Sequence, residues 1–109
     1  MTEQGLQSGW VVVCDSAKVT PGEGFGIALG DARVGIYRLD DGSLHAIGDI
    51  CTHEFALLSD GFVDGDQVEC PLHAALFDIR TGKCHGPMAF VDVPAYPTRE
   101  QDGKVLIFV

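Results

Sequence analysis

Apolar and polar residues alternate in short runs along most of the chain, and turn-forming residues separate these runs. The turns contain Gly and Asp, as at 30–31, 41–42 and 101–103. No segment of useful length has the periodicity of a helix. The strand-like runs are rich in β-branched and aromatic residues and occupy 10–14, 25–30, 33–39, 43–49, 96–100 and 104–109. This pattern predicts an all-β fold, a sandwich or barrel of antiparallel strands.

Length and charge narrow the class of protein. The 109 residues fit a single domain over 1–109, without repeats or a dividing linker. The formal net charge of −9 argues against nucleic acid or an anionic membrane as partner, because both attract basic surfaces. Between Arg38 and Arg80 there is no Lys or Arg, whereas nine acids occur there, which predicts a negative field over this segment.

The same sequence predicts a cytoplasmic location. No window of about 18 apolar residues is present, so no membrane span is expected. The first ten residues lack the basic and apolar regions of a secretory signal. In the cytoplasm the four cysteines stay reduced, which favours metal binding or redox chemistry over disulfides.

Two short motifs supply a candidate metal site. Cys51-x-His53 is followed, after sixteen residues, by Cys70-x-x-His73. Four such ligands suit Zn²⁺ in a Cys₂His₂ site, or a [2Fe–2S] cluster with two Cys on one iron and two His on the other. Zinc fingers usually keep the two cysteines together and the two histidines together, whereas each motif here is mixed. The spacing therefore favours the cluster and leaves zinc as the alternative.

The paired motifs resemble the Rieske iron–sulfur signature. The likeness extends to the neighbouring Asp-Gly turns, to the strand and hairpin over 77–83, and to Gly86-Pro87, which is similar to the start of the proline-containing loop that covers the cluster in this family. The resemblance spans essentially the whole chain. It implies an antiparallel β-sandwich with a cluster-binding subdomain at about 45–90.

The resemblance also implies roles for the ligands. Cys51 and Cys70 would bind the inner iron, and His53 and His73 the outer one. Partners would dock, and electrons leave, at His53, His73, Glu54 and Pro87. The sequence suggests no catalytic residue.

The sequence further predicts a reduction potential at the low end of the Rieske range of roughly −150 to +300 mV. High-potential members carry an extra cysteine in each loop and hydroxyl donors to the cluster. The corresponding positions here hold Ala56, Leu72, Ala75 and Phe77. Without those donors the sulfides stay electron-rich, which lowers the potential.

A few residues depart from the family pattern or have no assigned role. Glu54 and Ala74 stand where Gly is usual after each histidine. Glu54 is either a solvated acid or a residue that changes the His53 pKa or selects a partner. Cys14 is expected to be a buried small hydrophobe. Cys84-His85 is expected to be a strand-to-loop pair near the cluster, and the alternative is a redox role or contacts that support the ligands.

By resemblance, the chain is expected to carry single electrons within a bacterial aromatic-ring dioxygenase system. It would take them from a flavoprotein NAD(P)H reductase and pass them to a terminal oxygenase, with brief docking steered by acidic surface. A chain of this length leaves no room for a separate catalytic metal domain, so it is not expected to be an enzyme. The alternatives are a small Rieske subunit of a nitrite reductase and a zinc-stabilised binding module without redox activity.

Overall fold

The computed structural model describes residues 9–52, 56–72, 75–86 and 91–109. Short strands dominate these residues, and two single-turn 3₁₀ helices accompany them. The elements in chain order are β1 (Trp10–Asp15), η2 (Ser16–Lys18), β2 (Phe25–Leu29), β3 (Ala32–Arg38), β4 (Leu44–Gly48), η3 (Leu58–Asp60), β5 (Phe62–Asp64), β6 (Gln67–Glu69), β7 (Leu76–Asp78), β8 (Ala95–Tyr96), β9 (Thr98–Gln101) and β10 (Lys104–Phe108).

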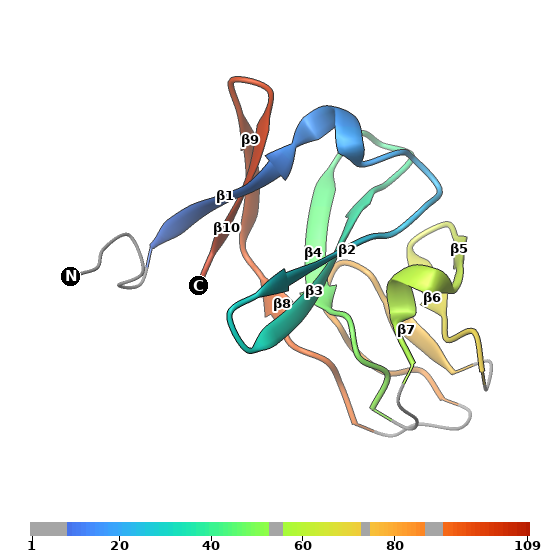
Figure 1. Cartoon of the computed structure of the whole chain (residues 1–109). Coiled ribbons are helices and arrows are strands. Elements are labelled where there is room, and N and C mark those ends of the chain that lie inside the picture. The colour runs from blue at the N-terminus through green and yellow to red at the C-terminus, as the bar shows by residue number, and fades with distance from the viewer. Residues whose placement is uncertain (1–8, 53–55, 73–74, 87–90) are drawn as a thin grey trace.

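The strands form three antiparallel sheets, and Figure 1 shows the sheet that contains β3 and β4 between the other two. The first sheet has the order β1-β10-β9, the central sheet β2-β3-β4-β8, and the small third sheet β5-β6-β7. Hairpins join most neighbours, but β1 pairs with β10 and β4 with β8, which are far apart in the chain. The predicted all-β antiparallel fold is confirmed.

The central sheet is buried on both faces because successive side chains of a strand point in opposite directions. Val34, Ile36 and Ala46 pack with residues of β10 in the core toward the first sheet. Tyr37 and Ile47 instead belong to a second core that includes residues of the small sheet. One sheet thus supports both halves of the molecule.

The second core lies beneath the small sheet. Val68 on β6 and Phe77 on β7 are fully buried in it, together with Leu58 of η3. Cys51 and Cys70 are part of the same core. The two cysteines of the predicted metal site are therefore held by the packing that joins the small sheet to the central one. Among the described residues, no helix is long and apolar enough to cross a membrane.

Candidate metal centre

Cys51 and Cys70 each begin a loop that is closed in the same way. The backbone N–H of Cys51 donates to the carbonyl oxygen of Ala56 at 2.9 Å, and that of Cys70 donates to the carbonyl oxygen of Ala75 at 2.8 Å. Both cysteines are buried, with 3% and 1% of their surface exposed. The segments that leave β4 and β6 both run toward the end of the molecule opposite the chain termini (Figure 1). Two equivalent loops therefore begin at buried sulfur atoms in one core.

Asp49 anchors the base of the first loop. Its side chain is completely buried and accepts hydrogen bonds from the backbone N–H of Ser59 at 2.7 Å and from the Ser59 hydroxyl at 2.8 Å. Arg33 lies 3.7 Å from the same carboxylate. Burial raises the pKa of Asp49, although the bonds from Ser59 act in the opposite direction. A Cβ atom at Gly26 would lie 2.7 Å from Asp49 Oδ2, so this position has room only for Gly.

Three polar contacts hold the two ends of segment 84–92. The Thr52 hydroxyl donates to the carbonyl oxygen of Val91 at 2.6 Å, which ties the first loop to this segment. The backbone N–H of Cys84 donates to Asp92 Oδ1 at 2.8 Å. The Cys84 sulfur accepts a hydrogen bond from Gly86 N–H at 3.3 Å. Thr52 and Cys84 therefore both lie at the junction between these segments.

The remaining predicted site residues lie outside the described residues. His53, His73, Glu54 and Pro87 are in this group, so their predicted roles stay predictions. Cys14 is described and is only partly buried, because it packs at the margin of the core toward the first sheet. Cys14 was expected to be buried, and the structure shows that it is buried only in part.

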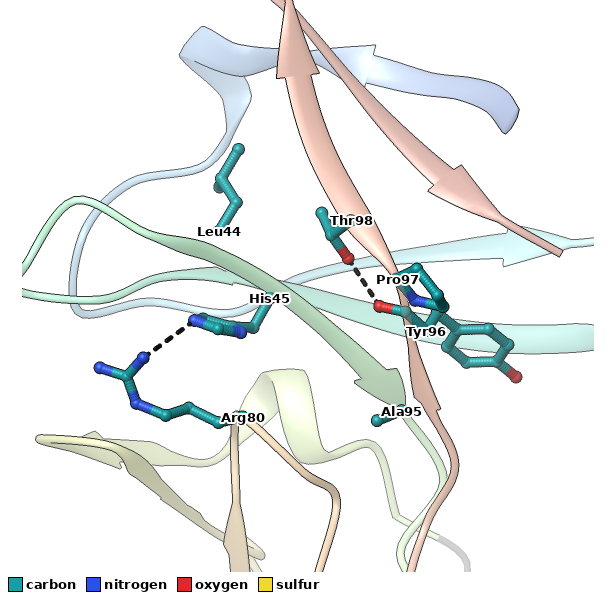
Figure 2. Close-up of a pocket in the computed structure, with 7 residues that line it drawn as sticks. All are labelled: Leu44, His45, Arg80, Ala95, Tyr96, Pro97 and Thr98. Atoms are coloured by element: carbon teal, nitrogen blue, oxygen red, sulfur yellow. Dashed lines mark hydrogen bonds between the residues drawn. The ribbon is translucent and has the colours of Figure 1, made fainter. Parts of the chain in front are cut away.

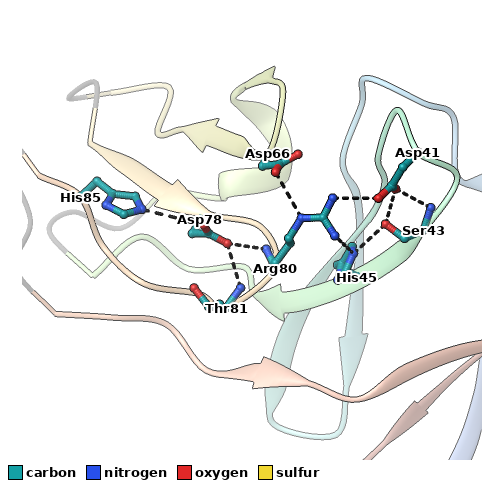
Figure 3. A network of polar contacts seen from close by, with 8 residues as sticks. All are labelled: Asp41, Ser43, His45, Asp66, Asp78, Arg80, Thr81 and His85. Carbon is teal, nitrogen blue, oxygen red and sulfur yellow. Dashed lines mark hydrogen bonds and ion pairs between the residues drawn. The ribbon is translucent and has the colours of Figure 1, made fainter.

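A network of ion pairs and hydrogen bonds around Arg80 neutralises part of the negative charge between Arg38 and Arg80 (Figure 3). The Arg80 guanidinium donates to Asp41 at 2.9 Å and to Asp66 at 3.2 Å, and so joins the β3–β4 turn to the β5–β6 turn. With Asp49 facing Arg33, three of the eight acids of this segment that the structure describes pair with an arginine. The negative field is consequently weaker near Arg80 than the sequence suggested.

His45 lies beside this network. Its Nε2 atom is 2.8 Å from the Ser43 hydroxyl oxygen and 3.4 Å from Arg80 Nη1. Burial, reinforced by the Arg80 charge, lowers the pKa of His45, while Asp41, Asp66 and Asp78 partly offset this. Figure 2 shows the pocket of about 360 Å³ that His45 and Arg80 line with residues of β4, β8 and β9. Neither Cys51 nor Cys70 lines this pocket.

The described residues fit the cofactor that the sequence suggested. Cys51 and Cys70 are the two sulfur donors that one iron of a mixed Cys–His cluster needs, and their loops have matching closures. Ala75 and Phe77 are fully buried and carry no hydroxyl group, whereas Leu72 is largely exposed. The side chains at these positions therefore offer no hydrogen-bond donor, which is the basis of the predicted low potential.

Comparison with known proteins gives a consistent result. The model of the Rieske [2Fe-2S] domain matches residues 9–97. The biphenyl dioxygenase ferredoxin subunit of Pseudomonas sp. (strain KKS102) is 38% identical over 95 residues, which are 86% of this chain and 86% of that protein. The ferredoxin of Sphingomonas yanoikuyae B1 has a similar structure, with a TM-score of 0.86, 31% identity, and coverage of 93% of this chain and 99% of the other.

Two further solved structures bear on partners. The ferredoxin in a complex of reduced oxygenase and oxidised ferredoxin of carbazole 1,9a-dioxygenase matches with a TM-score of 0.81 and 32% identity, over 89% of this chain and 99% of that one. A putative NADH-dependent nitrite reductase small subunit from Mycobacterium tuberculosis matches with a TM-score of 0.80 and 32% identity, over 92% and 94% of the two chains. The fold, the two buried cysteine loops and these matches agree. This chain belongs to the Rieske [2Fe-2S] domain family, whose cofactor is a [2Fe–2S] cluster.

Proposed function

We propose that this chain is the ferredoxin component of a bacterial aromatic-ring dioxygenase system. In this role it takes electrons one at a time from a flavoprotein NAD(P)H reductase and passes them to a terminal oxygenase. The observation that carries the proposal is the pair of equivalent loops that begin at buried Cys51 and Cys70, in a chain that matches dioxygenase ferredoxins over most of its length. The chain supplies the electron carrier of the system, and the oxygenase supplies the catalytic site.

The proposed ligands are Cys51 and Cys70 for one iron and His53 and His73 for the other. The bound cluster supplies the ability to accept and release one electron. Burial of the cysteines keeps water away from the sulfur side. We place partner docking at His53 and His73 with Glu54 and Pro87, and the protein in the cytoplasm.

Ligand substitutions test this assignment. Replacing Cys51 or Cys70 by Ser should abolish the visible absorbance of the purified protein and the EPR signal of the reduced form. Cys14→Ser is the matched control, because this thiol lies at the margin of the other core. Cys14→Ser should keep the full iron content. A colourless wild-type protein that contains zinc and no iron would refute the proposal in favour of the zinc-binding module.

A second candidate function is the small subunit of a nitrite reductase, which the match to the Mycobacterium tuberculosis chain favours. Such a subunit would remain bound to a large catalytic chain, whereas a ferredoxin binds its partners only briefly. Affinity purification from the native organism separates the two. Stable recovery with a large nitrite-reducing chain would support the second candidate.

A further inference from the structure

The small sheet exposes an outer face that has no covering element among the described residues. Val63, Val68 and Phe77 point into the core, so their neighbours along β5, β6 and β7 point outward. The strand register aligns these outward residues in two rows across the sheet. One row is Phe62, Glu69 and Leu76, and the other is Asp64, Gln67 and Asp78.

Phe62 is the most exposed large apolar residue of the described chain, at 64%. It lies on β5, which is the edge strand of the small sheet. An aromatic side chain exposed to this extent loses the stabilisation that burial would give, at about 25 cal/mol for each Å². Aromatic residues in such positions are typical anchors of protein interfaces.

The carboxylates around Phe62 are uncompensated. Asp64 and Glu69 have no ion-pair partner within the described part of the chain. The cations that form ion pairs do so elsewhere, and Arg99 lies over the Trp10 ring on the first sheet. Among the described residues, the ion pairs of Arg and Lys are Arg33–Asp49, Arg38–Glu100, Arg80 with Asp41 and Asp66, and Lys104–Asp15, and His85 Nε2 lies 3.9 Å from Asp78 Oδ2. The charge beside Phe62 therefore remains available to a basic partner.

This face borders the second cysteine loop. Glu69 directly precedes Cys70, and Leu76 directly follows Ala75, whose carbonyl oxygen closes that loop. The row of Phe62, Glu69 and Leu76 therefore lies at the base of the loop that begins at Cys70. A partner bound on this face would contact the chain next to the metal centre.

We propose that the outer sheet face, defined as Phe62, Asp64, Glu69 and Leu76, is a further contact surface for the terminal oxygenase, in addition to the docking proposed at His53 and His73. The oxygenase would present cationic side chains around an apolar recess that receives Phe62. This inference rests on the proposed carrier function. We assign the face to the oxygenase because its carboxylates, which have no ion-pair partner among the described residues, suit a cationic partner surface, and because a ferredoxin 32% identical to this chain has a solved complex with an oxygenase.

The test measures electron transfer from the reduced holoprotein by stopped-flow spectroscopy. The acceptors are the oxygenases of the biphenyl and carbazole systems, and a second series measures reduction of the oxidised protein by the matching reductases. The variants are Phe62→Ser, Phe62→Tyr and the double change Asp64→Asn with Glu69→Gln. Val12→Ser and Asp31→Asn are matched controls, because Val12 is 58% exposed on the first sheet and Asp31 lies in the exposed β2–β3 turn.

Phe62→Ser should raise the oxygenase concentration needed for half-maximal rate by about tenfold, as for an interface anchor, and Phe62→Tyr should restore most of the affinity. The double variant should slow the second-order rate about tenfold at low salt and reduce its salt dependence. All these variants should keep the midpoint potential and the EPR signal of wild type. The control variants Val12→Ser and Asp31→Asn should also transfer electrons at the wild-type rate.

An effect on the oxygenase reaction, with or without one on the reductase reaction, supports the proposal. Oxygenase kinetics within twofold of wild type for Phe62→Ser and for the double variant would overturn it, even if reduction by the reductase changed. If wild-type protein transfers electrons to neither oxygenase, the carrier function fails in this assay and the inference fails with it. If wild type transfers electrons to an oxygenase and the variants do so at the same rate, the docking proposal fails and the carrier function stands.

Discussion

Asp49 offers a quantitative test of how the first cysteine loop is supported. Replacing it by Ala removes two hydrogen bonds to a charged acceptor, at 2.7 and 2.8 Å, and leaves the Ser59 N–H without that partner. Each such bond contributes about 1.5–3 kcal/mol. The burial that raises the pKa of Asp49 shows that the carboxylate also has a desolvation cost, which the substitution removes. The expected net loss for Asp49→Ala is about 3 kcal/mol of unfolding free energy.

Asp49→Asn is the informative companion variant. The amide oxygen can still accept from the Ser59 N–H, and the amide group carries no charge to desolvate. We expect a loss of about 1 kcal/mol, and a similar loss for Ser59→Ala, which keeps the backbone bond to Asp49. The expected order of stability is therefore wild type, then Asp49→Asn, then Asp49→Ala.

Anaerobic urea unfolding, followed by circular dichroism and by the visible absorbance of the cluster, measures these differences. With a slope of about 1.5 kcal/mol/M, the Asp49→Ala midpoint should fall by about 2 M. Cluster absorbance should be lost at the same urea concentration, because Asp49 is two residues from Cys51. A change below 1 kcal/mol for Asp49→Ala, or equal losses for the Ala and Asn variants, would refute this account of the anchor.

The raised pKa of Asp49 also predicts the direction in which folding stability changes with pH. Because its folded-state pKa is raised, the folded protein binds the proton more readily than the unfolded chain does. The contribution of Asp49 to stability therefore increases as the pH falls from neutral, through the folded-state pKa, toward the unfolded value of about 3.9. Wild type should gain stability relative to Asp49→Asn in this window.

Three other substitutions have definite expectations. Gly61→Ala would place a Cβ atom against the carbonyl oxygen of Glu69, one residue before Cys70, so it should lower the unfolding free energy by about 3 kcal/mol and reduce the iron content. Gly65→Ala lies in open space at a φ of 61°, so it should lower the unfolding free energy by only about 1–2 kcal/mol and keep the cluster. Equal urea midpoints for the two variants would contradict this expectation. Thr52→Val removes the hydroxyl bond to segment 84–92 and should shorten the lifetime of cluster absorbance in air, with Thr52→Ser retaining it. The lowered pKa of His45 favours its neutral form in the folded state, so wild-type stability should fall as the pH drops below about 6.5, and His45→Gln should flatten the profile of urea midpoint against pH between 7 and 5.

Local sequence patterns predicted most of the strands, because hairpin strands and their turns depend on neighbouring residues. Pairings across the chain were not predictable in this way. β8 joins β4 after a separation of about 50 residues, and β10 joins β1 across nearly the whole chain. Such pairings depend on which apolar faces meet in three dimensions, and a single sequence does not specify this.

The metal motif was predictable because the ligands of each half lie two or three positions apart in the sequence. The contacts that support its loops were not predictable, because they join distant residues. Asp49 was counted among the acids of a negative segment, yet it is fully buried against Ser59. A carboxylate that follows a strand looks the same in sequence whether it faces solvent or another loop. The partner of Thr52 is 39 residues away, so no spacing rule could have revealed that contact.

The central sheet determines how far this metal centre can be treated as a module. Tyr37 on β3 and Ile47 on β4 belong to the core that holds Cys51 and Cys70, while alternate residues of the same strands build the opposite core. A fragment cut from the middle of the chain would lose Tyr37 and expose the apolar side chains beneath the cysteines. Engineers who wish to move this redox centre into another protein would therefore need to carry the shared sheet with it, and both faces of that sheet would need a cover in the new host.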